Sequence, residues 1–303
     1  MMGERHIGKT YPPTLMTVRQ TLQEGTSFLA RKGVTSARLD AELLLGKVMG
    51  AGRESLYVDD EMPLQGSERR RFQRLVERRA RREPVSYITG QWEFWSLEFL
   101  VTPAVLVPRP ETELLVEIVL ALMAQFDEGL PLKLLDLGTG SGVIAVSLAK
   151  EQRNGEIWAT DLSGEALEIA RANATHHGVE RKIHFLQGDL FEPVKEYRRF
   201  FQMVISNPPY VRRGEMKHLP REIQDWEPKA AIDGGWDGLD LYRRIIQEGH
   251  RYLVDGGLMA LEIGADMGSE VSRLFAATGC FSKCSMYKDY AGRDRVLVAR
   301  KLA

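Results

Sequence analysis

The chain has 303 residues, 44% of them hydrophobic and 27% charged, and a formal net charge of -1 at pH 7. That length can hold one large domain and a smaller one, and a charge so near zero excludes a general attraction to nucleic acid or to anionic membranes. Cys280 and Cys284 are too few for a disulfide framework. No apolar run approaches the roughly 20 residues that cross a membrane. We expect a cytoplasmic monomer with no membrane partner and no stable nucleic-acid partner.

The N-terminal part is predicted to be helical. Residues 1–13 are expected to form a flexible tail, whereas apolar residues recur at helical spacing from residue 14 to residue 83 and predict a small helical domain. Its last helix carries the arginine-rich stretch at residues 68–82, which includes Arg78 and Arg79. A solvated helix face is the first interpretation of this stretch, and a docking surface for an acidic protein or RNA is the alternative.

Between residues 84 and 110 the chain is rich in aromatic and β-branched residues and is bounded by prolines. We expect a hairpin here that links two domains. From residue 111 to residue 303, strand-like and helix-like segments alternate. This predicts an α/β fold, with a doubly wound, mostly parallel, Rossmann-like sheet. Strands are expected at residues 132–137, 157–160, 183–186, 203–206, 258–263 and 295–300. Helices are expected at residues 111–125, 165–174, 241–253 and 269–277, and from residue 142 onward.

In such a sheet the ligand lies at the carboxyl ends of the strands, and the first strand is followed by a glycine-rich turn. Asp161 ends the second strand, where its carboxylate can accept hydrogen bonds from both hydroxyls of a ribose. The turn lacks the third glycine spaced for a pyrophosphate, and the acidic Asp136 precedes it. The cationic S-adenosylmethionine is therefore favoured over a dinucleotide, and a plain glycine-rich turn is the remaining alternative. The turn consists of Gly138, Thr139, Gly140, Ser141 and Gly142.

The third strand leads to Asp189 and Leu190. Asp189 can accept a hydrogen bond from the exocyclic amine of an adenine, and Leu190 can cover a face of the ring. The alternative is that they are a turn residue and a core leucine.

The fourth strand runs into Asn207-Pro208-Pro209-Tyr210. Prolines have no N–H, so the carbonyls of Asn207 and Pro208 face no competing donors. A planar group bearing NH2 can donate to the Asn207 side chain and to the Pro208 carbonyl while Tyr210 stacks on its face. The tetrad therefore predicts an acceptor site for an amide or an aminated base, with Asn207, Pro208 and Tyr210 as catalytic groups. A rigid Asn-Pro turn is the structural alternative.

Three stretches, "LLDLGTGSG", "ISNPPY" and "REPVSYITGQWEFWSLEFLVTPAVLVPRPETE", resemble the release-factor glutamine methyltransferases, the HemK family of class I S-adenosylmethionine-dependent enzymes. The resemblance runs over nearly the full chain to the closing "GRDRVLVAR". It implies that the turn at residues 138–142 holds the methionine part of the cofactor and that Asp161 holds the ribose. The tetrad at residues 207–210 would hold the substrate glutamine, with Asn207 also bordering the cofactor.

The same resemblance implies a substrate, the glutamine of the Gly-Gly-Gln motif in class I peptide-chain release factors. Our hypothesis is that the helices of residues 14–83 recognise the release factor while the catalytic domain takes its loop. Ribosomal-protein glutamine methyltransferases and adenine-N6 methyltransferases of nucleic acids carry similar tetrads, so both stay open as alternatives. Arg109, Glu111 and Glu113 either line the pocket, where one of the glutamates meets the cofactor ammonium, or cap the following helix. The glycine-rich stretch at residues 227–240 is expected to form a loop over the pocket.

Overall fold

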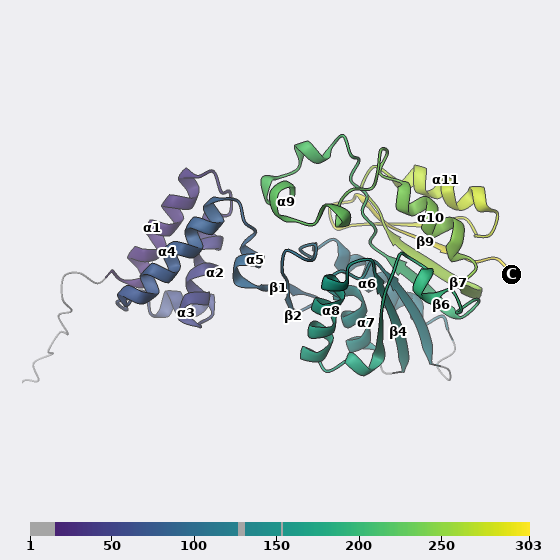
Figure 1. Cartoon of the computed structure of the whole chain (residues 1–303), viewed down its shortest axis with the longest axis horizontal. Coiled ribbons are helices and arrows are strands. Elements are labelled where there is room, and N and C mark those ends of the chain that lie inside the picture. Colours follow the sequence, from purple (N-terminus) through teal and green to yellow (C-terminus); the bar gives the residue numbers. More distant parts are fainter. Residues whose placement is uncertain (1–15, 127–130, 153) are drawn as a thin grey trace, which may run out of the picture. The chain divides into compact units, whose positions relative to one another are not determined.

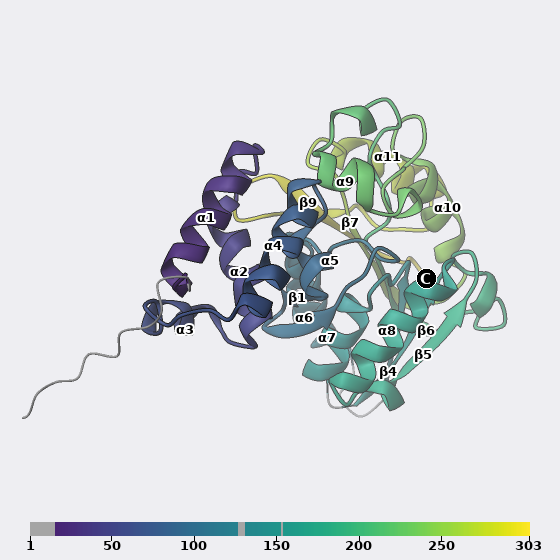
Figure 2. The ribbon, with the colours of Figure 1, turned by 60° about the vertical axis from the view of Figure 1, so that its left-hand side comes forward.

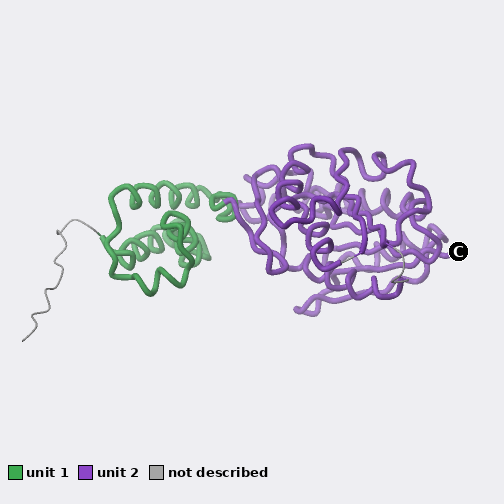
Figure 3. The backbone as a smooth tube through the Cα atoms, turned by 90° about the horizontal axis from the view of Figure 1, so that it is seen from below, with its two compact units in different colours: residues 1–89 green, residues 90–303 purple. Residues whose placement is uncertain are grey.

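The computed structural model describes residues 16–126, 131–152 and 154–303 (Figure 1). The predicted tail at residues 1–13 lies outside the described residues. The chain forms two compact units, residues 1–89 and residues 90–303 (Figure 3). The division falls after Thr89, inside the stretch at 84–110 for which the composition indicates a linker.

The first unit is helical, and local sequence signals set the ends of its helices. Thr17 begins the first helix in a reciprocal capping box with Gln20, and Gly50 ends the second in the left-handed conformation. The fifth helix corrects the expectation of a strand directly after Pro84. The helices are α1 (Val18–Arg31), α2 (Ala37–Met49), α3 (Arg53–Val58), α4 (Gly66–Ala80) and α5 (Val85–Thr89).

Helices α1, α2 and α4 lie side by side (Figure 2). They pack around an apolar core of their own, with Leu29, Leu44 and Leu45 fully buried. A Cβ at Gly25 of α1 would lie 2.5 Å from Cζ of Phe72 on α4. The missing side chain therefore lets the Phe72 ring lie directly against α1.

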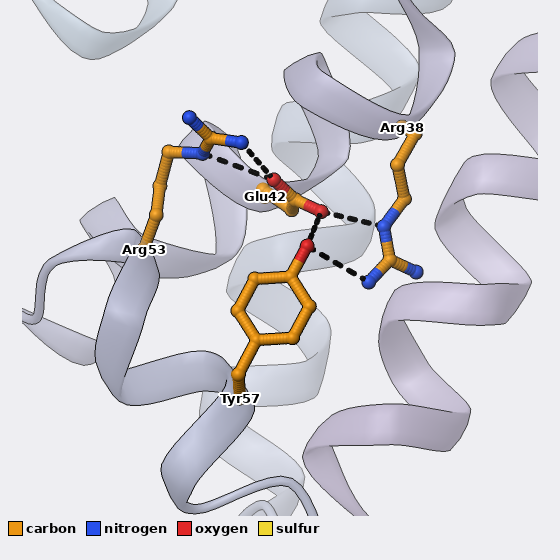
Figure 4. Close-up of polar contacts among 4 residues, drawn as sticks. All are labelled: Arg38, Glu42, Arg53 and Tyr57. Atoms are coloured by element: carbon orange, nitrogen blue, oxygen red, sulfur yellow. Dashed lines mark hydrogen bonds and ion pairs between the residues drawn. The ribbon is translucent and has the colours of Figure 1, made fainter.

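A buried carboxylate joins α2 to α3. The Glu42 side chain is 1% exposed and accepts hydrogen bonds from Arg38 Nε at 2.5 Å, from Arg53 Nη2 at 2.6 Å and from the Tyr57 hydroxyl (Figure 4). With two guanidinium groups beside it, the carboxylate is paired, as a buried charge requires. The short helix α3, whose buried residue is Leu56, is thereby fixed to α2.

Two of the arginines in α4 are structural, which corrects the interpretation of the whole stretch as a solvated face. Arg79 Nε lies 2.6 Å from Asp40 Oδ2, and the two side chains are 7% and 3% exposed. Arg78 Nε donates to Glu83 Oε2 at 2.8 Å. The exposed arginines of α4 are Arg70, Arg71 and Arg74.

The second unit begins with a tight hairpin, β1 (Gln91–Phe94) and β2 (Leu97–Leu100). Trp95 and Ser96 at its turn have φ angles of +54° and +55°, as in a type I′ turn. Helix α6 (Thr112–Met123) follows.

The centre of this unit is a seven-stranded sheet in the order β5-β4-β3-β6-β7-β9-β8. The first five strands in that order are parallel, β9 pairs antiparallel with β7, and β8 pairs antiparallel with β9. The doubly wound, mostly parallel sheet is confirmed. The strands are β3 (Leu132–Leu137), β4 (Gly155–Asp161), β5 (Ile183–Gln187), β6 (Phe201–Ser206), β7 (Leu253–Glu262), β8 (Ser285–Lys288) and β9 (Asp294–Arg300).

Side chains alternate between two cores, one on each face of the sheet. On β3, for example, Leu134 packs into the core with α6, α7 and α8, whereas Leu135 packs into the core with α10 and α11. Both faces are therefore covered, as in Rossmann-like folds. The remaining helices of the unit are α7 (Val143–Glu151), α8 (Gly164–His176), α9 (Arg221–Trp226), α10 (Asp240–Gly249) and α11 (Gly268–Thr278), with short 3-10 helices at Glu180–Lys182, Glu192–Val194, Met216–His218 and Lys229–Ala231.

Two predicted boundaries are wrong, the end of the helix expected at residues 241–253 and the start of the strand expected at residues 258–263, and two elements were not predicted. The helix expected at residues 241–253 ends at Gly249, and β7 already begins at Leu253, before Gly256 and Gly257. The sequence of the edge strand β8 and of the short helix α9 has no pattern clear enough to predict either element. In the part of the chain that the structure describes, no helix is long and apolar enough to span a membrane.

Candidate active site

The predicted cofactor turn and the predicted acceptor tetrad begin side by side. Strands β3 and β6 are parallel neighbours, and Leu137 at the end of β3 pairs with Ser206 at the end of β6. Gly138 and Asn207 therefore leave the sheet at the same level. β4 and β5 lie to one side of this pair and β7 to the other. Such a reversal of strand order opens a crevice at the carboxyl edge, where ligands of doubly wound sheets bind.

The turn after β3 needs its glycines for two different reasons. Gly138 and Gly140 have φ angles of +70° and +57°, and a Cβ at either would meet no atom within 4 Å, so open space lies beside them. Gly142 has a φ angle of +82°, and its Cβ would lie 3.1 Å from Ala170 Cβ on α8. The first two glycines thus leave room for a ligand, whereas the third allows α8 to pack closely.

Backbone hydrogen bonds hold this turn to β4. Gly138 N and Thr139 N both donate to the carbonyl oxygen of Thr160, at 2.8 and 3.0 Å. The carbonyl of Ser141 accepts from Asn173 Nδ2 at 2.8 Å. These hydrogen bonds fix the backbone of the turn without any contribution from a ligand.

Asp136, inside β3, is a fully buried carboxyl group beneath the turn. The Thr139 hydroxyl donates to its Oδ2 at 2.7 Å, whereas Oδ1 has no hydrogen-bond partner among the described residues. Burial raises the pKa of Asp136 to about 7, and the charge of Asp161 adds to that rise. A cationic ligand group would stabilise the ionised form of this carboxyl.

Asp161 ends β4 and is oriented by two backbone donors. Gly140 N donates to its Oδ2 and Ser163 N to its Oδ1, both at 2.9 Å. Each carboxylate oxygen keeps a further lone pair, so the side chain can still accept from two hydroxyl groups. It also ties β4 to the turn after β3.

Asp189 and Leu190 lie after β5 in a strained turn. Leu190 has a φ angle of +51°, and its carbonyl accepts from the Thr160 hydroxyl at 3.2 Å. The Asp189 carboxylate is ion-paired with Arg244 Nη2 at 2.7 Å. An adenine amine would share this carboxylate with an arginine, so the adenine contact stays a prediction for both residues.

The Asn207 side chain has a defined partner. Its Nδ2 donates to the hydroxyl of Thr112, at the start of α6, over 3.1 Å. Within the described residues no donor reaches its Oδ1. This acceptor is therefore available to a ligand, as the acceptor prediction requires.

Two glycines of the stretch at residues 227–240 allow this stretch to pack directly against the backbone of Tyr210. A Cβ at Gly234 would lie 2.7 Å from Tyr210 Cα, and a Cβ at Gly238 would lie 2.5 Å from the Tyr210 carbonyl oxygen. The neighbouring Val211 N donates to Ile232 O, and Gly234 N donates to Val211 O. The stretch is thus hydrogen-bonded along the segment that follows the tetrad. Burial raises the pKa of the Tyr210 phenol, so the ring carries no charge at neutral pH.

The charged residues at the start of α6, Arg109, Glu111 and Glu113, differ in whether their side chains already have partners. Arg109 Nη2 lies 2.7 Å from Glu227 Oε1, and the Glu227 side chain is 2% exposed. Glu113 Oε1 accepts from Trp95 N in the hairpin turn at 2.8 Å. Glu111 precedes α6 without a side-chain cap hydrogen bond. Of the two glutamates, only Glu111 keeps its carboxylate uncommitted in the described part of the chain.

Sequence reasoning missed Glu262 and Thr112. Glu262 is the last residue of β7 and is 1% exposed, and neither carboxylate oxygen forms a hydrogen bond of normal geometry with a described residue. Burial raises its pKa to about 7, against the nearby Thr112 hydroxyl and Arg295 guanidinium, which lower it. An acidic residue inside an apolar strand is the signal that could have drawn attention to it, as it did for Asp136.

The fold and this crevice define a Rossmann-like methyltransferase. The protein-family model of the methyltransferase small domain matches residues 115–223, and the family model of the PrmC N-terminal domain matches residues 20–90. A solved methyltransferase from Pyrococcus furiosus has the same fold, with a TM-score of 0.50 and 20% identity over 69% of this chain and 91% of that one.

Two relatives at higher identity define the family. The release factor glutamine methyltransferase of Geobacter sulfurreducens is 40% identical over 291 residues, which cover 96% of this chain and 99% of the relative. That of Moorella thermoacetica is 41% identical over 284 residues, covering 94% and 98%. The chain belongs to the release factor glutamine methyltransferase family.

Proposed function

We propose that this protein transfers a methyl group from S-adenosylmethionine to the side-chain amide nitrogen of the glutamine in the Gly-Gly-Gln motif of class I release factors. The observation that carries the proposal is the orientation of Asn207. Its Nδ2 is committed to Thr112, and its Oδ1 is left as an acceptor beside the cofactor turn. The names of the relatives support the same substrate.

The residues at the edge of the sheet fit this cofactor. Gly138 and Gly140 have open space beside them, and the free Oδ1 of Asp136 lies beneath the turn. We propose that the turn at residues 138–142 holds the methionine part, that Asp161 holds the ribose, and that Asp189 and Leu190 border the adenine. When bound, the cofactor supplies an electrophilic methyl group on a positively charged sulfur.

The tetrad solves a chemical difficulty of the acceptor. An amide nitrogen is a poor nucleophile because its lone pair is delocalised into the carbonyl group. Asn207 Oδ1 and the Pro208 carbonyl would accept the two N–H hydrogens, which raises the electron density on nitrogen and orients it toward the methyl group. Pro209 keeps the turn rigid, and the Tyr210 ring stacks on the flat amide. The same contacts stabilise the positive charge that develops as the new bond to nitrogen forms, and the nitrogen then loses one of its two protons to solvent.

The helical unit is proposed to recognise the release factor. Arg78 is already paired with Glu83, and Arg79 with Asp40. An electrostatic contact with the release factor would therefore be made by the exposed arginines of α4, which are Arg70, Arg71 and Arg74. All the proposed catalytic and cofactor residues come from one chain, so we propose that a monomer is sufficient. Release factors act on ribosomes, which implies a cytoplasmic site of action.

The test is a transfer assay with labelled methyl donor. A purified class I release factor, its glutamine-to-alanine variant, purified ribosomal proteins and DNA are the four acceptors. We expect label on the wild-type factor alone. Label on DNA would favour adenine methylation, and label on a ribosomal protein but not on the factor would favour the other glutamine alternative. Either result would overturn the proposal.

A further inference from the structure

The loop at residues 227–240 presents a tryptophan to solvent. Trp236 is 85% exposed, although Gly235 before it and Gly238 and Leu239 after it are buried. A ring of this size usually loses most of its surface to the interior of a protein, because its large apolar area is unfavourable in water. Contacts within the described chain therefore leave most of the indole uncovered.

Hydrogen bonds along the loop hold Trp236 in place. Arg213 N donates to the Gly235 carbonyl at 2.8 Å, and Asp240 N donates to the Gly234 carbonyl at 3.1 Å. Gly235 has a φ angle of +91°, which a glycine adopts readily. Because this backbone is ordered before any partner arrives, binding through Trp236 has little conformational entropy to lose.

Trp236 also lies close to the acceptor tetrad. A Cβ at Gly234 would lie 2.7 Å from Tyr210 Cα, so the two backbones touch. Consecutive Cα atoms are about 3.8 Å apart, which places Trp236 Cα, two residues beyond Gly234, within about 12 Å of Tyr210 Cα. A standard protein interface covers about 800 Å² of each partner, or a disc about 16 Å in radius. An interface centred on the tetrad therefore covers Trp236 as well.

The charged groups beside Trp236 are paired within the chain. Asp237 Oδ1 accepts from Arg243 Nη1 at 3.0 Å, and Asp233 Oδ2 accepts from Arg213 Nε at 3.1 Å. This part of the surface therefore offers a partner the neutral indole rather than an unpaired charge. An indole packs well against apolar side chains and other rings. The partner that fits it is a protein with an apolar patch close to the residue that it delivers to the tetrad.

We propose that Trp236 is a docking residue that packs against apolar side chains of the release factor next to its Gly-Gly-Gln motif. The inference rests on the proposed function and deepens it. The tetrad selects an amide, which many proteins carry, whereas a contact at Trp236 selects the protein that presents the amide. Tryptophan is among the side chains whose removal weakens protein interfaces most.

The test measures the affinity of the full-length enzyme for a class I release factor by isothermal titration calorimetry, with S-adenosylhomocysteine in the cofactor site. We expect Trp236→Ala to raise the Kd roughly 30-fold, which corresponds to about 2 kcal/mol at an interface hot spot. Leu302→Ala is the control and should bind like the wild type. Leu302 is 49% exposed and follows β9 beyond Arg300, which pairs with Leu258 away from the carboxyl ends of the parallel strands.

Two further measurements separate docking from other roles. Because the tetrad itself is unchanged, kcat of Trp236→Ala at saturating release factor should equal that of the wild type. The ratio of the two Kd values should be the same at about 0.1 M and about 1 M salt, although the Debye length falls from about 10 Å to about 3 Å, because the contact is apolar.

Three results would overturn the inference while transfer by the wild type still supported the function. They are a wild-type Kd in Trp236→Ala, a loss of affinity that disappears at high salt, and a lower kcat with an unchanged Kd. If the wild-type enzyme transferred no label to the release factor, both the proposed function and this inference would be wrong.

Discussion

Arg79 of α4 and Asp40 of α2 form an ion pair in the interior of the first unit, with 2.6 Å between Nε and Oδ2. Asp40 also accepts from the Ser36 hydroxyl at 2.8 Å. A carboxylate in this position depends on the guanidinium beside it, since burial without a partner would be very costly.

Replacing Arg79 should therefore destabilise the helical unit. We expect Arg79→Ala to lower the free energy of unfolding by about 3–5 kcal/mol, because it leaves Asp40 buried and less well compensated. Arg74→Ala, at an exposed position of the same helix, should change it by less than about 0.5 kcal/mol. Urea denaturation followed by circular dichroism measures both. Equal stability of the two variants would contradict the structural role of Arg79.

Gly234→Ala should damage the acceptor site without touching the cofactor turn. Its Cβ would lie 2.7 Å from Tyr210 Cα, so the tetrad must move. We expect a KM for the release factor raised roughly tenfold or more and an unchanged Kd for the donor. Gly214→Ala is the matched control, because its Cβ would meet no atom within 4 Å. Steady-state kinetics measures both variants. Equal KM values for the release factor in the two variants would refute this account.

Asp161→Ala should weaken donor binding. It removes the acceptors of Gly140 N and Ser163 N together with the proposed contact to the ribose. Hydrogen bonds to a charged group contribute about 1.5–3 kcal/mol, which corresponds to a Kd raised roughly 10- to 150-fold. Isothermal titration calorimetry checks the value, with Glu165→Ala on the exposed first turn of α8 as a control of equal charge change. Wild-type affinity in Asp161→Ala would exclude Asp161 from the cofactor site.

Stability should fall with rising pH because of Glu262. The folded-state pKa is about 7, above the ordinary value of 4.5, so the folded protein keeps a proton that the unfolded chain loses between these values. The stabilising effect is present below pH 4.5 and is lost as the pH rises to about 7, on the order of 3 kcal/mol in total.

Glu262→Gln removes that titration. We expect its free energy of unfolding to decline less than that of the wild type between pH 5 and pH 8. Glu270→Gln, at a partly exposed position in the first turn of α11 where the glutamate pKa is lowered, should retain the wild-type slope. Denaturation curves across this pH range make the comparison. Parallel slopes for wild type and Glu262→Gln would mean that Glu262 has an ordinary pKa in the folded protein.

Local patterns were sufficient to predict much of this molecule. The turn after β3 and the tetrad after β6 are short, contiguous motifs, and the alternation of strands and helices placed both at one edge of the sheet. The buried strands are continuous apolar runs, so their positions followed from the sequence. Each of these motifs can be recognised from a few consecutive residues, without knowing what they contact in the folded protein.

The rest depends on partners that are distant in the sequence. β8 is a four-residue edge strand that exists because β9 pairs with it, and Arg79 is buried because Asp40 lies opposite it on another helix. Thr112 and Asn207 are likewise brought together from separate segments by the packing of α6 against the sheet. No local pattern distinguishes these residues from exposed ones of the same type.

The most direct measurement of the central claim is peptide fragmentation by mass spectrometry after reaction with a class I release factor. With the wild-type enzyme, we predict one added methyl group on the side-chain nitrogen of the Gly-Gly-Gln glutamine. Asn207→Ala should lower that product roughly 100-fold or more while it still binds the donor, and Asn154→Ala, at an exposed asparagine, should match the wild type. A methyl group on any other residue, or an undiminished product with Asn207→Ala, would contradict the account.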